Sequence, residues 1–145
     1  EPLQRVDLVA LVESLVEDYQ SLGTVTLQAP DALQWSCRPK ALKRALTNLI
    51  DNALKYGGQA HMVLATGPSG VEVLVQDKGP GLPEDELQKV FEPFYRVEHS
   101  RNRDTGGAGL GLAIVRQIAR SHGGDVDLSN RAEGGLQARL SMVSK

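Results

Sequence analysis

The sequence predicts an α/β fold, specifically a two-layer α/β sandwich whose mixed, mostly antiparallel sheet is covered on one face by about three helices. Segments with apolar residues at helical spacing alternate along the chain with segments in which apolar and polar residues alternate as in half-buried strands. A glycine- and proline-rich turn at 67–70 joins two of these strands. At 145 residues the chain is long enough for a substantial core, and we expect residues 1–145 to form one domain.

The individual elements follow from local signals. Apolar residues at positions 8, 11, 12, 15 and 16 form a helical stripe, and Asp7 before them is a suitable N-cap. Pro39 suits the first turn of a second, long helix, which Gly57 and Gly58 end. In chain order we expect a helix over 7–22, strands over 24–28 and 33–38, a helix over 39–56, strands near 59–66 and 71–76, a short helix near 84–90, a helix over 109–122 and strands near 125–130 and 136–143.

Composition excludes several classes of function. The formal charge of -2 and the pI near 5.9 give no broad basic surface for nucleic acid, so phosphate binding would require a local pocket. The single cysteine, Cys37, excludes an internal disulfide. The three histidines are scattered along the chain, which argues against a zinc site. The apolar runs are far shorter than a membrane span. The abrupt start at Glu1 suggests a piece of a longer protein.

The first chemically informative stretch lies on the predicted helix 39–56. Asn48 and Asn52 are four residues apart and Asn52 and Lys55 three apart, so these side chains share roughly one face, with Tyr56 next to them. Such a line of groups can hold a metal ion and neutralise phosphate. By itself the stretch also fits two solvated amides and a surface lysine, but the two glycine-bearing segments that follow favour the functional interpretation.

The second stretch follows directly on the predicted strand 71–76. Its carboxylate, Asp77, stands at the end of a strand, where it is well placed to accept a hydrogen bond from a ligand amine. Gly79 and Gly81 allow the backbone to turn and to approach a ligand closely. The same residues are also ordinary turn formers.

The third stretch, residues 106–111 (Gly-Gly-Ala-Gly-Leu-Gly), opens a predicted helix. Its backbone N–H groups and the helix N-terminus favour phosphate. It is not a P-loop, because Leu112 and Ala113 stand where Lys and Ser or Thr are required. It is not a dinucleotide-binding fingerprint either, because the polar run 101–105 replaces the strand that must precede one. We expect a phosphate-facing helix start behind a polar lid, residues 97–108, whose structure varies without nucleotide.

Between the two glycine segments, the aromatic residues Phe91 and Phe94 flank Pro93. Aromatics around a proline commonly anchor a loop to a core. In a functional interpretation they fix the base of the lid, and Arg96 is available to contact phosphate.

Taken in order, these segments resemble the ATP-binding catalytic domain of sensor histidine kinases, which shares its Bergerat-type nucleotide-binding fold with gyrase B, Hsp90 and MutL. The resemblance covers about residues 3–143. Residues 48–56 are similar to the N box of the family, residues 77–81 to the first glycine box, residues 91–94 to the F box and residues 107–111 to the second glycine box.

The resemblance implies ATP as a ligand, Mg²⁺ as a cofactor and Asn48, Asn52 and Lys55 as the catalytic residues. Asn52 would coordinate a Mg²⁺ that bridges the phosphates, with Asn48 assisting, and Lys55 would contact phosphate. Tyr56 would pack against the adenine, and Asp77 would accept a hydrogen bond from its 6-amino group. The other residues that the resemblance places at the nucleotide are Gly79, Gly81, Phe94, Arg96, Gly107, Gly109, Leu110 and Gly111.

The resemblance also implies partners. The γ-phosphoryl group would pass to a histidine, yet no acceptor segment of the His-Glu-Leu-Arg-Thr-Pro kind occurs, and His61, His99 and His122 lie in unsuitable contexts. We therefore expect the acceptor on a separate helical dimerisation domain of the same kinase, and a response regulator receiver domain as the next partner. This chain would be a monomeric, cytoplasmic fragment of a homodimeric kinase anchored in the bacterial inner membrane. Ala108 stands where many relatives carry Ser or Thr, so one hydroxyl contact to phosphate would be missing.

Other functions remain open. ATPase clamps of the gyrase, Hsp90 and MutL kind place a general-base Glu four residues before the metal-binding Asn, but here that position is Asn48, which cannot accept a proton. Asp51 is close in sequence and is expected to point elsewhere on the helix. A serine kinase acting on a protein partner, and a module that binds nucleotide without catalysis, are further alternatives.

Overall fold

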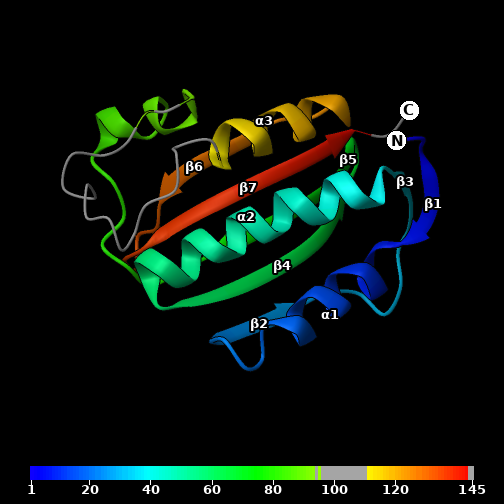
Figure 1. Ribbon diagram of the computed structural model, residues 1–145, viewed down its shortest axis with the longest axis horizontal. Helices are drawn as coiled ribbons and strands as arrows, with labels where there is room; N and C mark the ends of the chain where they lie inside the picture. The colour runs from blue at the N-terminus through cyan, green and yellow to red at the C-terminus, as the bar shows by residue number, and fades with distance from the viewer. Residues whose placement is uncertain (94, 96–110, 144–145) are drawn as a thin grey trace.

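The computed structural model describes residues 1–93, 95 and 111–143 of the chain. These residues form two layers, helices against a sheet (Figure 1). In chain order the elements are β1 (Gln4–Asp7), α1 (Leu8–Asp18), β2 (Thr24–Gln28), β3 (Gln34–Cys37), α2 (Pro39–Gly57), β4 (Gln59–Gly67), β5 (Gly70–Gln76), the short 3₁₀ helices η1 (Glu84–Glu86) and η2 (Lys89–Phe91), α3 (Gly111–Ser121), β6 (Val126–Asn130) and β7 (Leu136–Val143).

The main sheet has five strands in the order β2-β4-β5-β7-β6. β2 pairs with β4 in parallel, and the other three pairs are antiparallel. A parallel pair needs a long crossover, which α2 provides, whereas a tight turn joins β4 to β5. The predicted mixed, mostly antiparallel sheet is confirmed.

The helices α1, α2 and α3 all lie on one face of this sheet (Figure 1). Alternate residues of the strands are buried beneath them, as Val71, Val73 and Val75 are in β5. The opposite face is polar, and on it the Arg139 guanidinium of β7 pairs with the Glu72 carboxylate of β5. One buried face and one polar face make the two-layer sandwich that the sequence predicts.

α2 carries the predicted N box, and both of its ends are specified by the sequence. Pro39 occupies its first turn, and the N–H groups of Lys40 and Ala41 donate to the carboxylate of Glu1, at 2.8 and 3.1 Å. Gly58 ends the helix in the left-handed region (φ +76°), and its N–H bonds the carbonyl of Leu54 at 3.1 Å. The buried side of α2 is formed by Leu42, Ala45, Leu46, Leu49, Ile50 and Ala53.

His122 joins the beginning of α2 to the end of α3. Its ring is 6% exposed, and Nε2 accepts the backbone N–H of Arg38 at 3.0 Å. Nδ1 lies 2.8 Å from the carbonyl oxygen of Ile118, which can only accept, so Nδ1 carries the proton. This contact explains why a histidine outside the predicted motifs is buried.

Three elements differ from the sequence-based expectation. β1 was not expected, because only the pairing with β3 defines it: the two strands form a separate antiparallel sheet. α1 ends at Asp18, since the apolar stripe ends at Val16 and the following residues form turns. The expected helix 84–90 consists of two 3₁₀ helices, because three consecutive acidic residues in η1 leave no apolar stripe to support an α-helix.

Candidate functional site

The predicted site residues of the described chain gather at the end of the sandwich where α2 and β5 finish (Figure 1). α3 also begins on this side, and its first described residue, Gly111, meets α2 directly. The Asn48 Nδ2 amide donates to the carbonyl oxygen of Gly111 at 3.4 Å. Segments that are more than 60 positions apart in the chain therefore meet around one region.

On α2, the side chains of the N-box residues differ in burial in a way that suits a ligand. Asn48 and Asn52 are half-buried, whereas Lys55 and Tyr56 are exposed. The Lys55 ammonium lies 5.9 Å from the centre of the Tyr56 ring. Asp51 points to a different neighbour, since its Oδ1 accepts the Tyr19 hydroxyl of the α1 side at 2.7 Å. The expectation that Asp51 faces away from Asn48 and Asn52 agrees with this contact.

The carboxylate of Asp77 is held by the fold through only one of its oxygens. Oδ1 accepts the backbone N–H groups of Gly79 at 2.9 Å and Leu136 at 3.0 Å. Every buried side-chain nitrogen and oxygen atom of the described residues has a hydrogen-bond partner. Oδ2 has none among these residues, so it is reached by solvent although the residue as a whole is 6% exposed. One carboxylate oxygen is therefore fixed and the other is available to a ligand amine.

Two glycines bring the end of α2 into contact with the Asp77 loop (residues 77–82). A Cβ atom on Gly57 would stand 2.4 Å from the Cβ of Asp77, and one on Gly79 would stand 2.6 Å from the carbonyl oxygen of Tyr56. Real Cβ atoms do not approach so closely, so both positions require glycine. The sequence indicates only that Gly57 ends the helix, and its second role becomes visible in the structure.

A further neighbour of the Asp77 loop is missing from the sequence-based site: the β6–β7 turn (residues 130–136). The Arg131 guanidinium donates to the carbonyl oxygen of Asp77 at 2.6 Å. Gly135 (φ +99°) lies so close that a Cβ atom there would stand 2.0 Å from the same oxygen. The pair Gly134-Gly135 before the last strand is the sequence signal that could have indicated this close approach.

Phe91, the F-box aromatic residue that the structure describes, is 5% exposed and lies against α3. The Arg116 guanidinium is 3.8 Å from the centre of its ring and also bonds the Asp125 carboxylate, at 3.1 Å. Close by, the Tyr95 hydroxyl donates to the Glu86 carboxylate, which raises the pKa of Tyr95 to about 12. The structural role expected for Phe91, anchoring a loop to the core, agrees with these contacts. The predicted residues Phe94, Arg96, Gly107, Gly109 and Leu110, and the predicted lid 97–108, lie outside the described residues.

The oxygen donors of this region suit a magnesium ion that keeps several other ligands. Among the described residues, no three His, Cys, Asp or Glu side chains are grouped as a metal centre would require. The side-chain oxygens of Asn48 and Asn52 are hard, neutral ligands on one face of a helix. Mg²⁺ commonly takes one or two protein oxygens together with waters and substrate phosphates, so the residues fit this ion.

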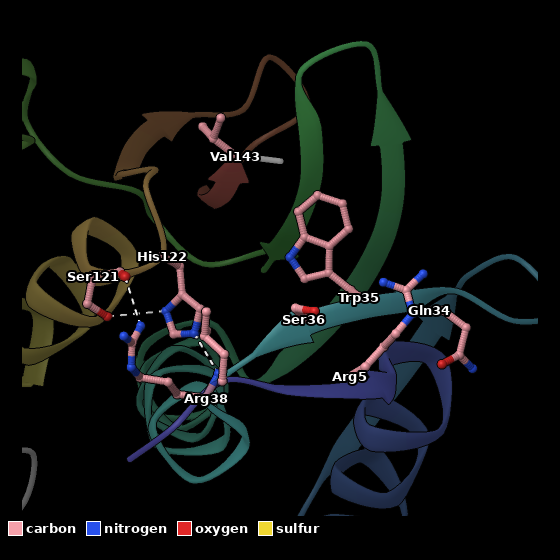
Figure 2. Close-up of a pocket in the computed structure, with 9 residues that line it drawn as sticks. Arg5, Gln34, Trp35, Ser36, Arg38, Ser121, His122 and Val143 are labelled. Atoms are coloured by element: carbon pink, nitrogen blue, oxygen red, sulfur yellow. Dashed lines mark hydrogen bonds between the residues drawn. The ribbon is translucent and has the colours of Figure 1, made fainter. Parts of the chain in front are cut away.

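A cavity of about 390 Å³ lies at the opposite end of the sandwich, beside β1, β3 and the end of α3 (Figure 2). Trp35, Arg5 and His122 are among its lining residues. It contains none of the predicted site residues, and its wall includes Val143, next to residues that the structure does not describe. In the described part of the chain, no helix is both long enough and apolar enough to cross a membrane.

Comparison with known proteins finds a family and individual relatives that agree with one another. The family described as histidine kinase-, DNA gyrase B-, and HSP90-like ATPase matches residues 37–144. The sensor histidine kinase GtrS of Pseudomonas aeruginosa is 44% identical over 142 residues, which are 98% of this chain and 29% of that protein. The signal transduction histidine-protein kinase BaeS of Escherichia coli is 34% identical, covering 94% of this chain and 31% of that protein. The chain thus spans less than a third of the length of these curated relatives.

Solved structures are similar over the whole chain. The ATP binding domain of PrrB from Mycobacterium tuberculosis is 30% identical and superposes with a TM-score of 0.81, covering 100% of this chain and 99% of that one. The mycobacterial sensor histidine kinase MprB is 27% identical, with a TM-score of 0.77 and coverage of 98% and 99%.

Proposed function

Since the chain belongs to the family of histidine kinase-, DNA gyrase B- and HSP90-like ATPases, we propose that it binds Mg-ATP and delivers the γ-phosphoryl group to a histidine on a separate phospho-acceptor domain. The observation that carries this proposal is the carboxylate of Asp77, beside the end of the N-box helix. Its Oδ1 is held by two backbone N–H groups, and its Oδ2 has no partner among the described residues. Burying a carboxylate costs free energy unless its oxygens meet hydrogen-bond donors, and in a residue that is 6% exposed a ligand amine would supply a donor to Oδ2.

Adenine would bind against the Asp77 loop. Asp77 Oδ2 would accept the 6-amino group, and the backbone of Gly79 and Gly81 would form the wall beside the ring. The Tyr56 ring, which is 46% exposed, would pack against the base. A carboxylate acceptor selects adenine over guanine, because guanine presents a carbonyl oxygen at the same position.

The phosphates would lie between α2 and the beginning of α3. Asn52, assisted by Asn48, would hold a Mg²⁺ ion, which when bound neutralises charge on the phosphates. Lys55 would contribute a positive charge near the terminal phosphate, and the backbone around Gly111 would donate hydrogen bonds at a helix start. These residues position and neutralise the phosphates, which is the main requirement of phosphoryl transfer.

The chemistry of a histidine acceptor suits a chain that only positions the phosphates and neutralises their charge. A neutral imidazole is already nucleophilic, so this chain does not need to remove a proton from it. We propose that the acceptor histidine, and the interface that forms a homodimer, belong to another domain of a longer kinase, and that a response regulator receiver domain takes the phosphoryl group next. The relatives GtrS and BaeS are much longer proteins named as kinases, which supports this arrangement. Location on the cytoplasmic side of a membrane-anchored parent is part of the same proposal.

An ATPase that hydrolyses ATP by itself is less well supported. At the position of the general base, Asn48 carries an amide, and it donates to the carbonyl oxygen of Gly111. The nearby Asp51 is engaged by the Tyr19 hydroxyl on another side of α2. Neither residue can remove a proton from an attacking water at the phosphates.

The test has two stages. Calorimetric titration with ATP, ADP and GTP, each with and without Mg²⁺, should show adenine-selective binding that Mg²⁺ strengthens. Labelled ATP is then supplied with a histidine-containing acceptor domain of a related kinase and, separately, with a serine-containing protein; only the first should be labelled. Asn52→Ala should abolish labelling, whereas the matched control Asp51→Asn should retain it. Normal labelling by Asn52→Ala would refute the site assignment, and labelling of the serine protein would refute the proposed reaction.

A further inference from the structure

The β6–β7 turn (residues 130–136) holds the Asp77 loop at both of its ends. At the first end, Asp77 and Leu136 exchange two hydrogen bonds, each 3.0 Å: the N–H of Asp77 donates to the carbonyl oxygen of Leu136, and the N–H of Leu136 donates to Asp77 Oδ1. Arg131 adds a third bond, from its guanidinium to the carbonyl oxygen of Asp77, at 2.6 Å.

At the second end, Asn130 binds the backbone of Leu82 as a neighbouring strand would. Its Oδ1 accepts the N–H of Leu82 at 2.9 Å, and its Nδ2 donates to the carbonyl oxygen of Leu82 at 2.7 Å. The same amide nitrogen lies 3.5 Å from the Glu84 carboxylate. The amide of Asn130 therefore satisfies both backbone groups of the last residue of the loop.

The close packing at Gly81 shows how tightly Asn130 approaches the loop. Gly81 is in the left-handed region (φ +73°), and a Cβ atom there would stand 2.3 Å from Asn130 Oδ1. Gly81 thus serves the contact with Asn130 in addition to any contact with a ligand. Arg131 is in turn fixed, since its backbone N–H donates to the carbonyl oxygen of Gly135 at 2.8 Å, and its side chain is 16% exposed.

We propose that Asn130 and Arg131 are positioning residues for base recognition: through the hydrogen bonds to Leu82 and to the carbonyl of Asp77, they set the path of residues 77–82 and so the direction of the Asp77 carboxylate. This inference rests on the proposed function, in which Asp77 binds the adenine amine. Neither residue touches the nucleotide. Their effect reaches it through the orientation of an acceptor, because hydrogen bonds weaken steeply as their angle departs from linear.

The test compares ATP with inosine triphosphate, which has a carbonyl oxygen in place of the 6-amino group. In Asn130→Ala, the loop loses both bonds to Leu82, and we expect ATP binding by the 145-residue chain to weaken about tenfold. Inosine triphosphate cannot use a well-directed carboxylate acceptor, so its binding should weaken much less, and the preference for ATP should fall. Arg131→Ala should act in the same direction.

Ser129→Ala is the matched control, because Ser129 is an exposed neighbour in β6. It should change neither affinity. Asn130→Asp provides a second variant in case Asn130→Ala does not fold. It keeps the acceptor for the N–H of Leu82 but places an oxygen that can only accept opposite the carbonyl oxygen of Leu82 and near the Glu84 carboxylate, so the preference for ATP should fall at least as much.

The outcomes separate the inference from the proposed function. If the unaltered chain binds ATP selectively and the Asn130 variant that folds keeps the same preference for ATP, the inference is wrong and the proposed function stands. An equal loss for both nucleotides would also overturn it, since that result indicates general loosening. If the unaltered chain binds neither nucleotide, the proposed function is wrong, and the inference, which rests on it, is wrong as well.

Discussion

At the scale of single residues, Asp77 has two carboxylate oxygens with different tasks, one bound by backbone N–H groups and one open to solvent. Asp77→Asn can keep the acceptor at Oδ1 and then presents an NH₂ group at the open position, where it repels the adenine amine. We expect ATP binding to weaken by about 1.5–3 kcal/mol, the usual value of a hydrogen bond to a charged group. Calorimetric titration with ATP and inosine triphosphate measures this, and Asp127→Asn, at an exposed position of β6, is the control. An unchanged preference for ATP would contradict the role of Asp77.

At Gly57 we predict an effect of the opposite kind, because an added side-chain atom would interfere with Asp77. The Cβ atom of Gly57→Ala would overlap Asp77, so the loop must shift. Overpacking of this kind typically costs about 1–3 kcal/mol, and the better helix propensity of Ala returns up to about 1 kcal/mol. We expect lower stability to urea together with weaker ATP binding. Gly67→Ala, where a Cβ atom meets nothing within 4 Å, controls for the substitution itself; equal behaviour of the two variants would show that the contact with Asp77 is unimportant.

The residues that the sequence predicted for the site, and those that it did not, differ in a physical respect. Asp77 and the Asn48–Asn52 pair could be identified because strand ends and helical spacing fix direction locally. The close contacts of Gly57 with Asp77, and of Gly135 with the same residue, join positions 20 and 58 residues apart. No local pattern encodes such a contact, because it depends on how separate elements meet.

At the scale of elements, long segments with a clear period were predicted well. α2 carries a proline at its start, a buried stripe and a left-handed glycine at its end, and its predicted range differs from the observed one by a single residue. β1 and η1 have no such signals. The four residues of β1 are a strand only because β3 lies beside them, so pairing, and not local preference, defines that element.

Asp125, just before β6, links that strand to α3 and gives this contact a pH dependence. Burial acts to raise its pKa, but the N–H of Val126 and the guanidinium groups of Arg120 and Arg116 outweigh it and hold the pKa below the usual value of 3.8. A lowered pKa means that the stabilisation is present above the pKa of the unfolded chain and is lost as the pH falls through the folded one.

We therefore expect the unaltered chain to lose stability between about pH 5 and pH 3, and Asp125→Asn to lose less over the same interval. The difference should stay below about 1 kcal/mol, because the side chain is 41% exposed and solvent screens the pairs. Urea unfolding of both proteins at pH 7 and pH 3 measures it. An identical acid sensitivity of the two proteins would show that other carboxylates dominate.

At the scale of the whole molecule, the proposed site lies between α2, the Asp77 loop and the beginning of α3, so a bound nucleotide would contact elements from distant parts of the chain. ATP with Mg²⁺ at about one hundred times its Kd should add about 2.7 kcal/mol of stability. For a domain of this size that corresponds to a Tm increase of roughly 5–10 °C. Thermal unfolding with ATP, with and without a chelator, measures the effect, and Asn52→Ala should show little of it. An equal increase in Asn52→Ala would remove that residue from the phosphate site.

The parallel pairing of β2 with β4 also bears on the order in which we expect the chain to fold. Thr24 of β2 lies opposite Gln59 of β4, 35 positions along the chain, whereas β4 and β5 are joined by a turn between Gly67 and Gly70. Closing the long loop loses more entropy before any pairing is gained, so we expect the β4–β5 hairpin to form early and β2 to join the sheet after α2. Changes in the hairpin should therefore alter the folding rate, and changes in β2 should mainly alter the unfolding rate.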